Sequence, residues 1–158
     1  MNKYGLLLVV AIFFVTFGCA DRSKTCDAAF LDEDYDSAAK SCGEAAERGD
    51  ACAQFTLGRM YDAGAGVPKD AVKAVEWLTL AAEQGLAEAQ AHLGMIYARG
   101  REGVPTDNVR AYMWLTVATA AGHPLSDSFK NRVQALMNPE QLAEGFWLSK
   151  EWLEKHKE

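Results

Sequence analysis

Hydrophobic residues recur with helical spacing along most of this chain. Between residues 53 and 63, Leu57, Met60 and Tyr61 fall on one side of a helix. Gly58 lies beside them and leaves room for the backbone of a neighbouring helix to approach closely. No segment shows the alternation of apolar and polar residues that is typical of a half-buried strand. The pattern therefore predicts an all-α protein.

A second helix is predicted after a glycine-rich loop. Asp70 is a good N-cap for this helix, and Gly85 is placed to end it. Between these two residues, the apolar positions again follow the helical period. We expect the inner face of this helix to contain Val72, Val75, Leu78, Ala81 and Ala82.

This two-helix unit occurs twice. Residues 53 to 85 align with residues 89 to 122, at a shift of 36 positions up to Gly100 and 37 positions beyond it, because the second loop has one extra residue. Repeated helix pairs bury their apolar faces by stacking, which predicts a solenoid. The residues of the second unit that match the first are Ala89, Gln90, Leu93, Gly94, Tyr97, Gly100, Gly103, Val104, Pro105, Asp107, Ala111, Trp114, Leu115, Ala118 and Gly122.

The duplicated motifs resemble the Sel-one-like repeat, a branch of the tetratricopeptide superfamily with an extended loop inside each repeat. Both units contain Leu-Gly-x-x-Tyr, Gly-Val-Pro and Trp-Leu, and the second has Ala118-Thr119 where the family has paired alanines. The resemblance implies a short α-solenoid of antiparallel helix hairpins that form a right-handed superhelix. The segment from Asp36 to Gly49 resembles the end of the first unit at a shift of 36 residues, which indicates a degenerate repeat before it.

Two further helices are predicted after Pro124. Ser126 or Asp127 is expected to cap the first of them, and Asn138, followed by Pro139, is expected to cap the second. A solenoid needs its last apolar face covered, so we expect this pair to be a C-terminal cap. The buried side of the second helix is expected to contain Leu142, Phe146, Trp147 and Leu153.

The first twenty residues differ from the rest of the chain. Lys3 precedes an uncharged stretch of sixteen residues from Gly5 to Ala20, which is shorter than the roughly twenty residues of a bilayer-spanning helix. A short basic start and a brief apolar core predict a secretory signal peptide. An ordinary secreted protein and an uncleaved membrane segment are the alternatives.

The segment from Val15 to Cys19 resembles the bacterial lipobox, with Thr16 where leucine is usual. The resemblance implies that the chain is cut before Cys19 and that this cysteine carries several acyl chains, which hold a protein on a membrane. Ala20 stands where an aspartate in this family would retain the protein at the inner membrane. We therefore expect a lipoprotein of the bacterial cell envelope, on the outer membrane and facing the periplasm.

These patterns divide the chain into six segments. The degenerate repeat is expected to open with a helix from about Lys24 to Leu31, which has lost the Leu-Gly-x-x-Tyr pattern. We expect a signal peptide at 1–18, a short tether at 19–25, the degenerate repeat at 26–52, full repeats at 53–88 and 89–125, and the helical cap at 126–158.

The cysteines other than Cys19 favour an oxidising compartment. Cys26 and Cys42 lie eight residues to either side of Asp34, so antiparallel helices would bring them opposite one another. We predict a disulfide between Cys26 and Cys42, which would contribute about 3 kcal/mol to stability by restricting the unfolded chain. A bond between Cys42 and Cys52 is the alternative pairing.

Composition and charge limit the classes of function. The chain has 158 residues, of which 49% are hydrophobic, and this is enough for one compact domain with its own core. It carries 16 basic and 22 acidic residues, a formal net charge of -6, and no basic cluster. Binding to nucleic acid is therefore not expected.

No motif predicts catalysis or a metal site. The chain lacks G-x-S-x-G, H-E-x-x-H, a P-loop and C-x-x-C, and its three histidines have no neighbouring ligand set. Asp32, Asp34 and Asp36 have the spacing of a calcium loop, but Ser37 occupies the position that needs glycine, so a solvated turn is the better interpretation. We expect no cofactor and no enzymatic activity.

The candidate binding residues come from the family resemblance. In tetratricopeptide-type solenoids, the first helix of each pair lines a concave groove, and its mixed side chains here suit an extended peptide or a partner helix. The alternative is that these residues are ordinary surface and packing positions. The resemblance selects Phe55, Arg59, Asp62, Ala91, Met95 and Arg99.

The leading hypothesis is a noncatalytic adaptor, tethered by lipid to the membrane, that binds a protein or peptide. One alternative is binding or hydrolysis of β-lactams, which is linked to some cysteine-rich relatives with this repeat. Those relatives carry a regular cysteine pair in each repeat, whereas no cysteine follows Cys52 here. A regulator of a cell-wall enzyme is a further alternative.

Overall fold

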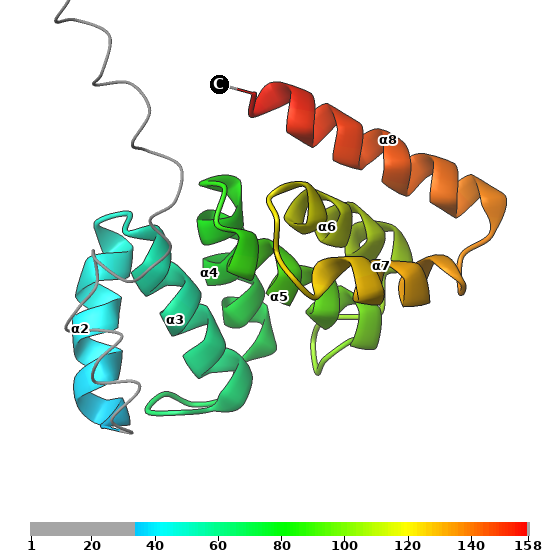
Figure 1. Ribbon diagram of the computed structural model, residues 1–158. Coiled ribbons are helices and arrows are strands. Elements are labelled where there is room, and N and C mark those ends of the chain that lie inside the picture. The colour runs from blue at the N-terminus through cyan, green and yellow to red at the C-terminus, as the bar shows by residue number, and fades with distance from the viewer. Residues whose placement is uncertain (1–33, 158) are drawn as a thin grey trace, which may run out of the picture.

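The computed structural model describes residues 34 to 157, which form seven α-helices (Figure 1). Within these residues there is no strand, and one isolated bridge joins Arg101 to Val104 in a loop. The all-α prediction is confirmed. The helices are α2 (Tyr35–Glu47), α3 (Ala51–Ala63), α4 (Ala71–Glu83), α5 (Ala87–Arg99), α6 (Asn108–Ala120), α7 (Ser126–Gln134) and α8 (Pro139–Lys155).

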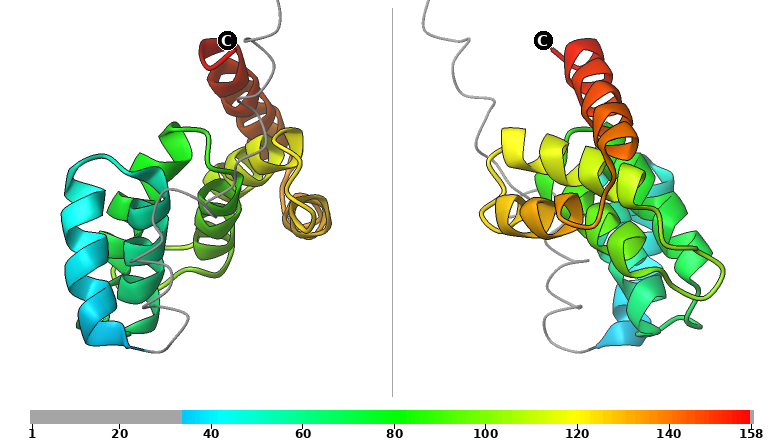
Figure 2. Two further views of the ribbon diagram at one scale, coloured as in Figure 1. Left: turned by 60° about the vertical axis from the view of Figure 1, so that its left-hand side comes forward. Right: turned by 90° about the vertical axis from the view of Figure 1, so that its right-hand side faces the viewer.

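The helices from α2 to α6 pack in chain order as a short solenoid (Figures 1 and 2). α3 and α4 form one hairpin, α5 and α6 form the next, and α4 contacts both α3 and α5. α2 packs against α3 on the other side. The two units predicted from the sequence are therefore stacked as neighbours.

The second helix of each unit ends with the same backbone motif. Gly85 has a φ of 85°, a left-handed conformation that residues with a side chain rarely adopt. This turn lets the Leu86 N–H donate a hydrogen bond to the Ala81 carbonyl at 3.2 Å. Gly122 ends α6 in the same conformation, and Gly49 does so after α2. The ending of α2 thus matches the expected end of a degenerate repeat.

Two glycines allow the helices of each hairpin to approach closely. A Cβ atom added to Gly58 would lie 2.7 Å from Cγ of Leu78, and one added to Gly94 would lie 2.5 Å from Cγ of Leu115. Both leucines are fully buried. The predicted close approach at Gly58 is confirmed, and the second repeat has the same contact.

The buried stripe of α4 differs at one position from the prediction. Ala71, Ala74 and Leu78 are buried at spacings of three and four residues, as are Ala81 and Ala82 further along. Val75 is partly buried, but Val72 is 45% exposed because it lies beside this stripe rather than on it. The prediction was wrong for Val72.

The C-terminal pair, α7 and α8, covers α6, since both helices pack against it. α8 begins as predicted: the Asn138 side chain accepts a hydrogen bond from the Gln141 N–H at 2.8 Å, and the Gln141 side chain accepts one from the Asn138 N–H at 3.1 Å. α7 has no side-chain N-cap, so the prediction of Ser126 or Asp127 in that role was wrong. Ser126 is the first helical residue instead, with its hydroxyl 2.8 Å from Nδ1 of His123.

The face that α8 turns toward α6 contains small residues, Gly145 and Ser149, rather than the predicted aromatic ones. A Cβ atom added to Gly145 would lie 2.9 Å from Cδ1 of Tyr112 on α6, so the helices are too close there for a bulky side chain. The prediction was therefore wrong for two residues. Leu142 and Leu153 are partly buried, whereas Phe146 is 58% exposed and Trp147 is 60% exposed.

Several predictions fall on residues 1 to 33, outside the described part of the chain. They are the signal peptide, the tether, the lipidation of Cys19 and the opening helix from Lys24 to Leu31. Among the helices of residues 34 to 157, none is both long enough and apolar enough to cross a membrane.

Cys42 and Cys52 are both disulfide-bonded in the structure. Cys42 lies in α2 and is fully buried in the core that α2 shares with α3. Cys26 lies outside the described residues. The pairing of Cys26 with Cys42 and the alternative of Cys42 with Cys52 therefore stay predictions.

Candidate functional site

The first helices of the two repeats, α3 and α5, bring their side chains together on one surface. The spacing of Phe55, Arg59 and Asp62 puts them on one face of α3, and that of His92, Met95 and Arg99 puts them on one face of α5. The rings of Phe55 and His92 meet edge-on, with centroids 6.2 Å apart. The two stripes therefore adjoin. We use the name α3/α5 face for Phe55, Arg59, Asp62, His92, Met95, Arg99 and the nearby loop residue Arg101.

Asp62 is the centre of this face. Its Oδ1 accepts a hydrogen bond from Nε of Arg101 at 3.0 Å, and its Oδ2 accepts one from Nε2 of His92 at 3.2 Å. The three side chains are only 15%, 28% and 23% exposed, respectively, so the network is partly withdrawn from water. Arg101 also donates to the Gly100 carbonyl at 3.0 Å, which fixes its guanidinium.

The charge states within this network are set by burial and by the neighbouring groups. Burial alone would raise the pKa of Asp62, but the hydrogen bonds from Arg101 and His92 and their charges together lower it. The pKa of His92 is also lowered, because burial and the cations Arg59 and Arg101 outweigh the attraction of Asp62. At neutral pH, Asp62 is therefore an anion, and His92 is neutral with its proton on Nε2.

Two further arginines give this face a positive character. The guanidinium of Arg59 lies over the ring of Phe55, 5.6 Å from its centroid, and the Arg59 side chain is exposed. Arg99 is also exposed, at the end of α5. As defined, the α3/α5 face contains three arginines and one aspartate, whereas the chain as a whole carries -6.

Five of the six residues that the sequence selected lie on this face. Ala91 is the exception, because it is 2% exposed and packs in the core. The stripe on α5 passes instead through His92, which stands three residues before Met95 and seven before Arg99. Met95 is partly buried.

Sequence reasoning missed His92 and Arg101. A signal was present, since both occur where the two repeats differ: His92 aligns with Thr56, and Arg101 lies in the loop that has one extra residue. Asp62 aligns with Ala98, so the charged network belongs to the junction of the repeats and not to the repeat motif.

This arrangement is suited to binding anions. Asp62 anchors two donors, while exposed guanidinium groups can form charge-assisted bonds with carboxylates. The ring of Phe55 offers an apolar contact beside them. Within residues 34 to 157, no three His, Cys, Asp or Glu side chains are grouped so that they could hold a metal ion.

Comparison with known families identifies the repeated unit. The family model of the Sel1 repeat matches residues 53–86 and 87–123. The chain thus contains two segments that match the Sel1 repeat. These matches coincide with the two helix hairpins, and Sel1 repeats typically mediate interactions between proteins. No curated protein matches the chain.

The solved structures that are similar to this chain include two with repeats of this kind. One is c5321, a protective antigen present in uropathogenic Escherichia coli strains and displaying an SLR fold, with 33% identity and a TM-score of 0.80 over 85% of this chain. The other is a Sel1 repeat protein from Oxalobacter formigenes, with 36% identity and a TM-score of 0.56 over 58% of this chain. The matches cover only 29% and 26% of those proteins, respectively.

Proposed function

We propose that this protein is a noncatalytic interaction module that binds an acidic protein segment or peptide on its α3/α5 face. The observation that carries the proposal is the meeting of α3 and α5 on two adjoining Sel1 repeats, where Arg59 and Arg99 are exposed and Arg101 is paired with the ionised Asp62. An extended acidic peptide can pair its carboxylates with the arginines and place an apolar side chain against Phe55.

The proposal is tested by selecting binders from a library of random twelve-residue peptides. We expect the selected peptides to be acidic and to lose binding to a variant that combines Arg59→Glu with Arg99→Glu. Arg101 is left unchanged because its bond to Asp62 supports the fold of the loop. Binding is measured by fluorescence anisotropy with labelled peptides, and the melting temperature shows whether each variant is folded.

The matched control combines Lys40→Glu with Lys150→Glu. These two exposed lysines lie on α2 and α8, outside the α3/α5 face, and their reversal changes the net charge by the same amount. The control should bind the selected peptides as the unmodified protein does. Equal losses in both variants would show a general charge effect, and unchanged binding to the Arg59 and Arg99 variant would refute the proposed surface.

We also propose that Cys19 carries a lipid that holds the module in the bacterial cell envelope, with the outer membrane as its location. The support is the resemblance of residues 15 to 19 to a lipobox. Mass spectrometry of the protein purified from membranes should find an N-terminal acylated Cys19. Cys19→Ser should release the protein from the membrane fraction, and a membrane-bound, unacylated variant would contradict the proposal.

A further inference from the structure

The two repeats contain a buried glutamine at the same position, Gln54 in the first and Gln90 in the second. Within residues 34 to 157, both polar atoms of the side-chain amide have a hydrogen-bond partner only in Gln54. In the first repeat, Nε2 of Gln54 donates to the Ala46 carbonyl at 3.1 Å. Its Oε1 accepts a hydrogen bond from Nε2 of Gln84 at 2.7 Å. Gln54 is 4% exposed, so both bonds replace contacts with water. Both polar atoms of the Gln54 amide therefore have a partner.

Gln90 occupies this position in the second repeat and is 1% exposed. Its Nε2 donates to the Ala82 carbonyl at 3.1 Å, which fixes the orientation of the amide because a carbonyl can only accept. Within residues 34 to 157, its Oε1 has no hydrogen-bond partner. The residue that aligns with Gln84 is Ala121, which has no donor in its side chain.

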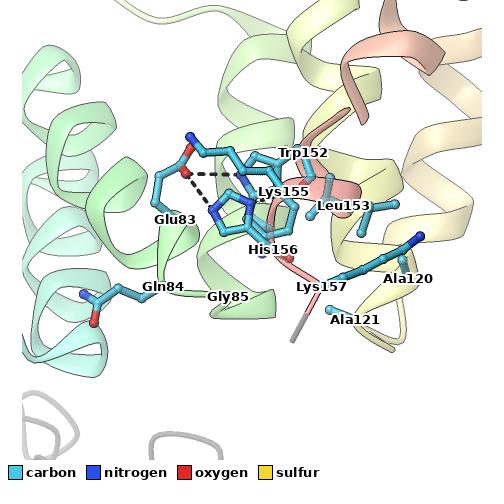
Figure 3. A pocket seen from close by; sticks show the side chains of 12 residues that line it. Glu83, Gln84, Gly85, Ala120, Ala121, Trp152, Leu153, Lys155, His156 and Lys157 are labelled. Atoms are coloured by element: carbon cyan, nitrogen blue, oxygen red, sulfur yellow. Dashed lines mark hydrogen bonds and ion pairs between the residues drawn. The ribbon is translucent and has the colours of Figure 1, made fainter. Parts of the chain in front are cut away.

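A pocket of about 680 Å³ lies at the place where this donor is absent. Gln90, Val117, Ala120 and Ala121 line it from α5 and the end of α6, and the end of α8 lines it from the other side. Figure 3 shows Gln84 pointing away from Trp152 and His156, in keeping with its bond to Gln54. Gln90 thus lines this pocket with a side chain whose Oε1 is buried and has no partner among residues 34 to 157.

The pocket walls define what kind of group fits. Oε2 of Glu83 already accepts a hydrogen bond from Nε1 of Trp152 at 3.2 Å and lies 3.3 Å from Nε2 of His156, so this oxygen is engaged (Figure 3). Leu153, which is partly buried, offers an apolar contact to a short aliphatic stem. The ammonium groups of Lys155 and Lys157 at the rim can donate to an oxygen atom.

We propose that this pocket binds the primary carboxamide of a glutamine side chain from a partner peptide. The carboxamide N–H₂ donates to Oε1 of Gln90 and so takes the place that Gln84 fills in the first repeat. Its oxygen accepts from a lysine at the rim, and its methylene groups lie against the apolar wall. A carboxylate offers no donor to Oε1 and is disfavoured there.

This site is separate from the α3/α5 face. Gln90 and His92 are two residues apart on α5, a rotation of about 200°, so they point to opposite sides of the helix. The carboxamide site is therefore independent of the acidic-segment binding proposed above, and either can fail without the other.

The probe for the experiment is N-acetylglutamine N-methylamide, with N-acetylglutamate N-methylamide as its isosteric control. Both are titrated into the ¹⁵N-labelled protein, and the side-chain amide of Gln90 and the indole N–H of Trp152 are followed by NMR. We expect saturable shifts of both signals with the glutamine probe in the millimolar range. Binding of the glutamate probe should be at least tenfold weaker, and equal binding of the two, or no saturable shift, overturns the proposal.

The role of the missing donor is tested with Ala121→Gln, which places an amide donor at the position that Gln84 has in the first repeat. Ala121 is exposed, so the longer side chain has room to fold over the pocket. We expect this variant to lose the probe-dependent shifts and to melt at a higher temperature. Ala121→Met, of similar size but without a donor, should not raise the melting temperature.

Two results with these variants contradict the proposal. Equal melting temperatures of Ala121→Gln and Ala121→Met would show that Oε1 of Gln90 does not need a donor. Unchanged binding of the glutamine probe to Ala121→Gln would place the binding elsewhere.

Discussion

His92 is held in its neutral form at the junction of the two repeats. Burial lowers its pKa from the ordinary value of 6.5, and the cations Arg59 and Arg101 lower it further, while Asp62 partly opposes this effect. The neutral ring can still donate its one proton to the Asp62 carboxylate. The hydrogen bond across α3 and α5 therefore does not require His92 to be charged.

The lowered pKa of His92 predicts a dependence of stability on pH. In the unfolded chain His92 takes up a proton near pH 6.5, whereas in the folded chain it does so only at lower pH, so the unfolded state is favoured as the pH falls through 6.5. The free energy of unfolding should thus be lower at pH 5.5 than at pH 7.5. His92→Gln keeps a donor for Asp62 but does not titrate, and it should reduce this difference.

Urea denaturation at the two pH values measures this prediction. The other titrating groups are present in both proteins, so their contribution cancels in the comparison. Asp62 does not affect the comparison. Because its pKa is lowered, the stability that it contributes is lost only as the pH falls below about its ordinary pKa of 3.8. An equal pH dependence in the His92→Gln variant would refute the lowered pKa.

The residues of the α3/α5 face show how far sequence reasoning reaches at this scale. The family resemblance selected Phe55, Arg59 and Asp62, and their spacing is enough to put them on one side of α3. The choice between Ala91 and His92 on α5 depends on how far that helix is rotated against α3, and this rotation comes from packing. Arg101 could not be placed because it reaches Asp62 from a loop.

At the scale of the helices, glycine has two opposite effects on stability. Gly94 lies in α5 at the contact with α6, where an added Cβ atom would lie 2.5 Å from Leu115 and 3.2 Å from the Ala111 carbonyl. Gly43 lies in α2, and a Cβ atom added there would meet nothing within 4 Å. The first glycine is required for packing, and the second only weakens its helix.

We predict opposite effects for the same substitution at these two positions. Gly94→Ala should lower the free energy of unfolding by about 1–2 kcal/mol, because crowding of the buried Leu115 outweighs the gain in helix propensity. Gly43→Ala should raise it by about 0.5–1 kcal/mol, since only the propensity changes. Chemical denaturation of both variants measures the two values. A Gly94→Ala variant more stable than the unmodified protein would show that the contact between α5 and α6 can accommodate a methyl group.

The elements themselves were predictable from local signals. Asp70, Asn138 and Gly85 set the boundaries of their helices as expected, because caps and left-handed turns depend on a few adjacent residues. The start of α7 was not predictable in this way. Ser126 bonds to His123 in the preceding turn, and this contact competes with the expected cap.

At the scale of the whole molecule, α8 ties the end of the chain to the first full repeat. It packs against α6 and continues to α4, where Nε1 of Trp152 donates to Glu83 at 3.2 Å. The ring of Trp152 stacks on His156, with centroids 3.9 Å apart, and meets Trp114 edge-on at 6.0 Å. The sequence predicted a terminal cap but wrongly placed Phe146 and Trp147 on its buried side, since both faces of α8 carry aromatic residues.

The two tryptophans of α8 should therefore contribute differently to the free energy of unfolding. Trp152→Ala removes the contacts with Trp114, His156 and Glu83 and should lower the free energy of unfolding by about 2–3 kcal/mol. Trp147, on the same helix, is 60% exposed, so Trp147→Ala should change it by less than about 0.5 kcal/mol. Urea denaturation measures both values. Because the two variants lose the same side chain from the same helix, equal effects would mean that α8 does not hold the repeats together through Trp152.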